Sequence, residues 1–308
     1  MKITIKTLTP IWTGGVDRNC DRIHETGIIG SLRWWYEAIV RGLGGYACDP
    51  TGDNKCEFNT KAYEKAKKDD KPKGEAIKNG LANVCPACEL FGCTGWGRKI
   101  KVIINDSGMN SNSIGMNGSF LIQLHELKKL TDEEKWLLYN VFYLIDKYGT
   151  IGGKCMLKPS NSSESGKYCE DRGQVEVIWE DTDISKPVIN KEGFKTRLSE
   201  QKEQFEKNRG KAFTEWPDLR YFIFSLNEGL DASNYMKLQY LSPDFLKGEK
   251  GAGEKPAKAN KFASFKNGKH FWGYTKADDI MFHQVLVELQ RLGLTGIKKG
   301  EEVIKNEL

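Results

Sequence analysis

The sequence predicts an α+β fold. Segments that alternate polar and apolar residues are typical of half-buried strands, and segments with apolar residues every three or four positions are typical of amphipathic helices. Along residues 2–180 these segments follow one another in the order β-α-β-β-α-β, which is the split ferredoxin-like pattern. The rest of the chain is a weaker copy of this order, without a repeat at the level of single residues.

Four strands are predicted in the first half. The segment KITIKTL alternates polar and apolar residues, and the proline and glycines of TPIWTGG end it. Two further strands flank a loop rich in Ser, Asn and Gly, which suits a hairpin. The predicted strands are residues 2–8, 99–106, 119–127 and 174–180.

Two helices are predicted between these strands. The segment SLRWWYEAIVRGLGG predicts a helix that Ser31 caps and a glycine pair ends, with Trp35 on its apolar, core-facing side. The segment TDEEKWLLYNVFYLIDKYG predicts a helix that begins after Thr131, which acidic residues follow, and ends at Gly149.

Residues 46–98 are expected to form a long insertion in the first domain. They lack apolar periodicity and include the lysine-rich segment KAYEKAKKDDKPKGEAIKNG. Such a composition is typical of a solvent-exposed insertion, so we expect one helix there and no contribution to the hydrophobic core.

The length of 308 residues suggests two domains. Beyond the predicted fourth strand, residues 190–210 predict a highly charged helix, residues 219–226 a strand and residues 276–293 an amphipathic helix. We therefore expect one domain at residues 1–185 and a second at residues 186–308.

The composition argues against a membrane-spanning or secreted protein. A hydrophobic content of 39% suffices for two cores, and no apolar run of about 18 residues is present to span a membrane. The segment MKITIKTLTPIW lacks the features of a signal peptide, so we expect a cytoplasmic location. The formal charge of +5 is too modest to indicate nucleic-acid binding by itself.

Four cysteines have spacing that suggests a metal site. CPACELFGC contains Cys85 and Cys88 in a C-x-x-C turn, which presents two thiolates to one tetrahedral metal. Cys48 and Cys56 lie upstream in the same insertion, which would gain from a metal that closes its long loop. We predict a structural zinc site of these four residues, although Cys93 could replace an upstream ligand. Inert buried thiols and a redox pair are the alternatives.

Three glycine-rich segments carry basic residues. They are DRNCDRIHETGIIGSLRWW, GCTGWGRKIK and GTIGGKCMLKPSNSSESGKYCEDRG. Glycine lets a phosphate backbone approach the main chain, and nearby Lys or Arg neutralises its charge. The loops after the first strand, before the second and before the fourth are expected to converge on one side of the sheet. The sequence contains no P-loop, Ser/His/Asp arrangement or H-E-x-x-H motif.

The segments TPIWTGG, TGIIGSLRWWYEAIVRGLGG, CPACELFGCTGWGRK and GTIGGK together resemble the RAMP superfamily of CRISPR proteins. Within it they are most similar to the family of first subunits of type III-B (Cmr) RNA-silencing complexes, over residues 8–180. The resemblance implies two RRM-like ferredoxin domains in tandem. It also implies an RNA-binding subunit, without a catalytic role, that holds the 3′ region of a guide RNA or the matching target RNA among other Cmr subunits.

On this basis we expect the protein to contact the RNA backbone in a way that does not depend on the base sequence. Trp96 is expected to stack on a base. The residues expected to contact phosphates are Arg18, Arg22, Arg33, Arg98, Lys154 and Lys158.

Two other functions remain open from the sequence. A metal-independent endoribonuclease that processes guide precursors would use His24, which lies beside Arg22 and Glu25, as its general base. Alternatively, the chain could be a zinc-stabilised assembly module whose basic surface meets acidic protein partners.

Overall fold

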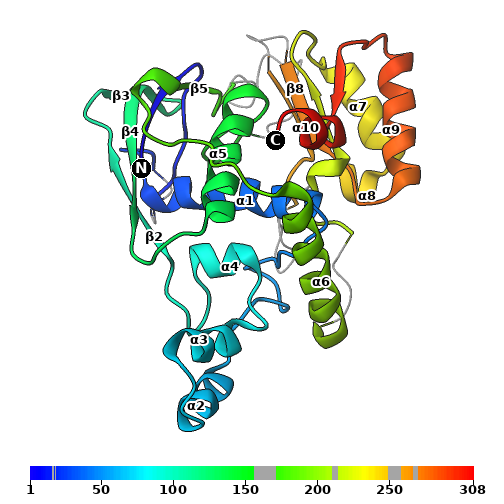
Figure 1. Ribbon diagram of the computed structural model, residues 1–308. Helices are drawn as coiled ribbons and strands as arrows, with labels where there is room; N and C mark the ends of the chain where they lie inside the picture. Colours follow the sequence, from blue (N-terminus) through cyan, green and yellow to red (C-terminus); the bar gives the residue numbers. More distant parts are fainter. Residues whose placement is uncertain (16, 18, 156–170, 210–213, 249–257, 266–269) are drawn as a thin grey trace.

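A computed structural model describes residues 1–308 except 16, 18, 156–170, 210–213, 249–257 and 266–269 (Figure 1). Its first sheet is antiparallel, with the strand order β2-β4-β1-β5 and a short extra strand on β4. The strands are β1 (Lys2–Thr7), β2 (Ile100–Asn105), β3 (Met109–Ser111), β4 (Met116–Glu126) and β5 (Val175–Ile178). This order is that of the split ferredoxin-like arrangement, and the predicted α+β class is confirmed.

Two long helices pack beside this sheet. Helix α1 (Glu25–Gly42) contacts α5 (Asp132–Lys147), and α5 contacts β5. Thr131 caps α5 as predicted: its hydroxyl accepts a hydrogen bond from the Glu134 backbone N–H, and the Glu134 carboxylate accepts one from the Thr131 N–H. A short 3-10 turn (Trp179–Asp181) follows β5.

The second half repeats the strand order of the first. Its antiparallel sheet has the order β7-β8-β6-β9, with α7 and α9 in the two connections. These elements are β6 (Phe222–Ser225), α7 (Ala232–Leu241), β7 (Phe262–Phe265), β8 (His270–Tyr274), α9 (Asp279–Arg291) and β9 (Ile297–Lys299). The other helices are α6 (Lys191–Arg209), a 3-10 turn (Leu219–Tyr221), α8 (Pro243–Leu246) and α10 (Gly300–Asn306).

Aromatic side chains join the two halves. Trp34 of α1 lies with its ring centroid 5.8 Å from Trp272 and 5.9 Å from Tyr274, both in β8. Trp35 is 1% exposed and donates its indole N–H to the Thr150 carbonyl, so its predicted core position is confirmed. Figure 1 shows α1 running from the first sheet toward the second. The boundary at residues 185 and 186 stays a prediction.

Helix α1 begins six residues before the predicted cap. Its N-cap residue is His24, and Ser31 lies within the helix, where its hydroxyl donates to the Gly152 carbonyl and accepts from the Gly152 N–H. The prediction was wrong because Gly27 and Gly30 suggested a loop. A Cβ on Gly27 would lie 3.0 Å from Thr13, so glycine there permits close packing.

The insertion contains three helices, not one, and it contributes to the core. Helices α2 and α3 form an arm that projects from the body in Figure 1, whereas α4 packs on α1. Cys48, Val84 and Leu90 are fully buried in the hydrophobic cluster. The helices are α2 (Thr60–Lys68), α3 (Lys73–Leu81) and α4 (Pro86–Phe91). Among the described residues, no helix combines the length and the apolar character needed to cross a bilayer.

Candidate metal centre and candidate nucleic-acid interface

The four predicted cysteines come together in a buried cluster. Cys48 follows α1, Cys56 precedes α2, and Cys85 and Cys88 lie at the start of α4, where Pro86 occupies the first turn. All four sulfur atoms lie within 4.8 Å of one another. The Sγ of Cys48 is 3.3 Å from that of Cys88 and 3.8 Å from that of Cys85.

This cluster has the dimensions of a four-thiolate metal site. A tetrahedral zinc ion with metal–sulfur distances of about 2.3 Å would hold its sulfur ligands about 3.8 Å apart. The four side chains are no more than 1% exposed, so solvent does not compete for the position between them. The cluster could therefore bind a metal ion, and its closed donor set suits a structural role better than a catalytic one.

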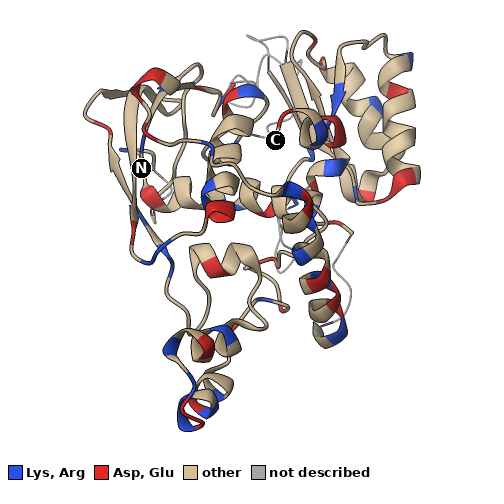
Figure 2. Ribbon diagram, in the orientation of Figure 1, with Lys and Arg blue, Asp and Glu red and all other residues tan. Residues whose placement is uncertain are grey.

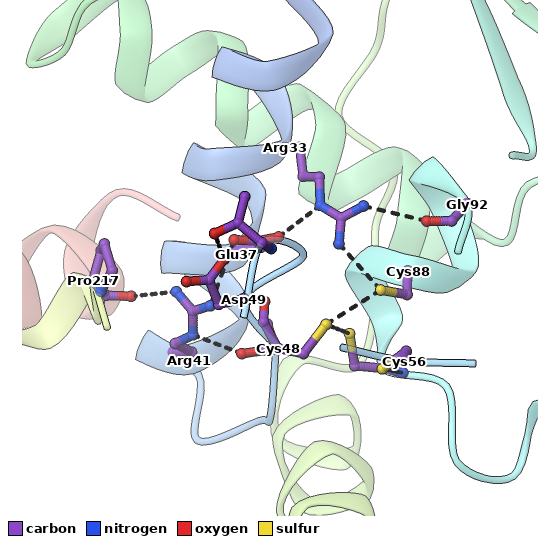
Figure 3. Close-up of polar contacts among 12 residues, drawn as sticks. Arg33, Glu37, Arg41, Cys48, Asp49, Cys56, Cys88, Gly92 and Pro217 are labelled. Atoms are coloured by element: carbon purple, nitrogen blue, oxygen red, sulfur yellow. Dashed lines mark hydrogen bonds and ion pairs between the residues drawn. The ribbon is translucent and has the colours of Figure 1, made fainter. Parts of the chain in front are cut away.

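Arg33 contacts this cluster from α1 (Figure 3). Its Nη2 donates to Cys88 Sγ at 3.1 Å, and its Nη1 donates to the Gly92 carbonyl at 3.2 Å. Its Nε donates to Glu37 Oε1 at 2.7 Å. Burial acts to lower the pKa of Arg33, but Cys88 and Glu37 together raise that pKa above its usual value. The structure thus gives Arg33 a role different from the predicted phosphate contact, because its guanidinium is turned inward.

A second arginine extends this buried network to the other half of the chain. Arg41 Nη2 lies 3.5 Å from Glu37 Oε2, and its Nη1 donates to the Pro217 carbonyl at 2.9 Å. Arg41 also donates to the carbonyls of Ala47 and Cys48 at the start of the insertion. Burial raises the pKa of Glu37, and the two arginines oppose that rise. The thiol cluster, α1 and the second half are thus joined by one set of polar contacts.

Two of the three glycine-rich loops converge as predicted. The loop after β1 meets the loop before β5, because β5 is antiparallel to β1 and Val175 pairs with Thr7. The Gly153 N–H donates to the Trp12 carbonyl at 2.7 Å, and Lys154 Nζ lies 3.8 Å from the centre of the Trp12 ring. Lys154 is exposed and has a φ of 57°, in the left-handed region that a side chain rarely adopts.

The third loop lies at the opposite end of the sheet, so the predicted convergence of three loops is wrong. Strands β1 and β2 are both antiparallel to β4, and Ile100 at the start of β2 pairs with Glu126 at the end of β4. The loop that enters β2 therefore lies near the start of β1. This position follows from the parallel directions of β1 and β2.

Trp96 and Arg98 belong to this distant loop. The Trp96 ring stacks on Phe58 with centroids 5.6 Å apart, and Lys128 Nζ lies 3.2 Å from the Trp96 ring centre. A base could stack there only after a neighbour moves. Arg98 is exposed, and its side chain has no hydrogen bond or ion pair within the described ranges.

A cavity of about 540 Å³ lies where the two converging loops meet α1 and β8. Aromatic and glycine residues make up much of its wall, and Lys154 is the charged residue among the described residues that line it. The lining includes Trp12, Gly14, Gly27, Gly30, Ser31, Trp34, Trp35, Gly152, Gly153, Lys154, Trp272 and Tyr274. This cavity is the strongest candidate for a ligand site at the glycine-rich loops.

Arg22 lies close to this region. Its guanidinium is half exposed and donates to Glu25 at 3.0 Å, while its carbonyl accepts from the Thr13 hydroxyl. His24 Nε2 is bonded to Asp21 at 2.8 Å. Arg18 and Lys158 lie outside the described residues. Figure 2 shows basic and acidic residues interspersed along α2 and α6, in keeping with the modest net charge.

Sequence reasoning missed several residues of these sites. Glu37 and Arg41 follow Arg33 at intervals of four on α1, a spacing that signals contact on one helix face. Trp12, Trp34 and Tyr274 line the cavity, but only the fold brings Tyr274 to the first half.

A comparison with protein families gives a match. A search of the curated proteins finds none similar to the chain. A sequence model of the RAMP superfamily matches residues 4–157, half of the 308 residues. The matched segment contains both converging loops up to Lys154, helix α1 and the four clustered cysteines. The chain therefore belongs to the RAMP superfamily, which is associated with CRISPR RNA-binding complexes.

Proposed function

We propose that this protein is a non-catalytic RNA-binding subunit of a type III-B (Cmr) CRISPR effector complex in the cytoplasm. It holds the 3′ region of the guide RNA, or the target RNA paired with it, beside other Cmr subunits. The observation that carries the proposal is the meeting of two glycine-rich loops, an aromatic-lined cavity and Lys154 in one place, in a chain of the RAMP superfamily.

The chemistry of this region favours an RNA backbone. Gly152 and Gly153 leave their main chain open to close approach, and Lys154 supplies a positive charge at the edge of the cavity. Contacts of this kind do not depend on base identity, which suits a complex that must accept any guide sequence.

The thiol cluster supports this function structurally. Cys48, Cys56, Cys85 and Cys88 would hold a zinc ion, which would tie the insertion to the body of the protein. Arg33 offsets part of the negative charge of such a site through its bond to Cys88.

The test measures binding of the full chain to single-stranded RNA of mixed sequence by fluorescence anisotropy at several salt concentrations. For single strands the logarithm of affinity falls with the logarithm of salt concentration with a slope of about 0.7 per phosphate contact. Lys154→Ala and Arg22→Ala should each reduce that slope by about 0.7. Lys207→Ala, which removes an exposed lysine of α6, is the matched control and should leave the slope unchanged.

The same samples test the alternatives. Affinity that stays flat between about 50 and 200 mM salt would refute backbone binding. RNA cleavage by the wild-type chain that His24→Ala abolishes would refute the non-catalytic role. Stable association with the other Cmr subunits after nuclease treatment, without any affinity for RNA, would favour an assembly module.

A further inference from the structure

We propose that the cavity between α1, the two glycine-rich loops and β8 receives one unstacked nucleobase of the bound RNA. This inference rests on the proposed RNA-binding function and adds to it a site for a base. The base would come either from the end of the strand or from an internal nucleotide that leaves the stack.

The lining favours a planar ligand of low polarity. Trp34, Trp272 and Tyr274 contribute aromatic rings, and glycines on α1 and the loops leave room between them. Base–aromatic contacts of this kind tolerate any sequence, because every base has a π face. The volume of about 540 Å³ lies within the usual range for small-ligand sites.

The charge at the edge indicates what the base is attached to. Lys154 is exposed and lines the cavity, so its position marks where the cavity meets the surface. Burial lowers the pKa of Lys154, with Arg172 as a second cation nearby. An ammonium group at the mouth of an aromatic cavity suits a base whose phosphate stays outside.

One buried donor in the wall lacks a partner. Trp272 is 2% exposed, and its indole N–H has no hydrogen-bond partner among the described residues. By contrast, the indole N–H of Trp35 is bonded to the Thr150 carbonyl. Buried donors are normally satisfied, but the Trp272 indole nitrogen is itself buried, so a base could reach it only if the wall of the cavity shifts.

Gly30 offers a way to fill the cavity without disturbing the fold. It lies in α1 and lines the cavity, and a Cβ added there meets no atom within 4 Å. Gly30→Leu should therefore fold normally and occupy the space that the base would need. Gly74→Leu is the matched control, because Gly74 lies in helix α3 with the same open surroundings and does not line the cavity.

The experiment uses oligoadenylate RNA that carries one 2-aminopurine, placed either at the 3′ end or in the middle. Acrylamide quenching measures the exposure of that base, and anisotropy measures total RNA affinity. In the wild-type complex we expect the base to be shielded at one of the two positions, which identifies its source. Gly30→Leu should abolish the shielding and weaken affinity about five- to 150-fold, the loss of one base stack.

Three outcomes would overturn the inference. Equal shielding and affinity in wild type and Gly30→Leu would show that no base enters the cavity, while the RNA-binding function would stand. Equal losses in Gly30→Leu and Gly74→Leu would show that the effect is not local. A wild-type chain without affinity for RNA would refute the proposed function together with the inference.

Discussion

Removal of the zinc ion proposed for the four cysteines should unfold the insertion locally and leave the first sheet intact. The perturbation is extraction of zinc from the full chain with a strong chelator, or the substitution Cys85→Ser. Helices α2 and α3 have few buried side chains, Ala66 and Ala76 being the apolar ones. Their packing therefore offers little to replace the metal.

The magnitude follows from the loops that the four thiolates close. In the chain-entropy model, closing the loop from Cys48 to Cys56 costs about 2.6 kcal/mol, and closing the loop from Cys56 to Cys85 costs about 3.6 kcal/mol. Binding of a structural zinc ion supplies about 10–16 kcal/mol, which exceeds this cost. Without the metal this closure cost is no longer offset, so we expect the free energy of local opening to fall by at least about 6 kcal/mol, which corresponds to at least roughly 10⁴-fold faster amide exchange.

Hydrogen exchange followed by mass spectrometry is the assay, with metal analysis of the same samples. The informative amides are Glu89, bonded to the Cys85 carbonyl at 2.8 Å, and Gly92, bonded to the Cys88 carbonyl at 2.9 Å. The ladder between β1 and β4 serves as the internal reference. Cys20→Ser is the matched variant, because Cys20 lies outside the cluster.

Two results would refute this reasoning. One is a purified protein with less than about half an equivalent of zinc, which is incompatible with a four-thiolate site of normal affinity. The other is α4 amides that stay equally protected after the metal has been removed. In that case packing on α1, and not the metal, holds the insertion closed.

Two further predictions concern stability. Thr131→Ala removes one bond of the capping box with Glu134 and should lower the free energy of unfolding by about 1 kcal/mol; an unchanged urea midpoint would contradict this. Burial lowers the pKa of His270 below its usual value of 6.5, although its bond to the Tyr148 carbonyl opposes the shift. The unfolded chain therefore takes up the proton at a higher pH than the folded chain does. As pH falls from about 6.5 toward the folded pKa, the free energy of unfolding decreases by at most about 1.4 kcal/mol per pH unit. His270→Gln keeps an N–H donor and should lack this loss; equal urea-unfolding curves for the two chains at both pH 7.5 and pH 5.5 would count against it.

The regular elements could be predicted because their signals are local. Thr131 and Glu134 stand three residues apart at the start of α5, and alternation marks β1 directly. The cysteine cluster was also predictable, since Cys85 and Cys88 form a short motif inside a segment without apolar periodicity. The helix and the strand are determined by neighbours in sequence, whereas the cluster also needs Cys48, which lies 40 residues before Cys88.

The errors came from contacts between distant segments. Arg33 and Glu37 have the spacing of a solvated surface pair, but the insertion covers that side of α1 and buries them. Gly27 looks like a helix breaker, although it lies within α1, where a Cβ would come within 3.0 Å of the Thr13 side chain. The displaced position of Trp96 was foreseeable, because the order β-α-β-β-α-β already makes the first two strands parallel.

Helix α1 presents two different surfaces, one to the cavity and one to the cysteine cluster. Gly30 and Trp34 line the cavity, whereas Arg33 contacts Cys88. Glu37 links Arg33 to Arg41, which contacts Pro217 of the second half. The backbone hydrogen bonds of a single helix fix the distance and angle between these surfaces. A change in the length or charge of the projecting arm would therefore leave the position of the cavity relative to the body of the protein unchanged.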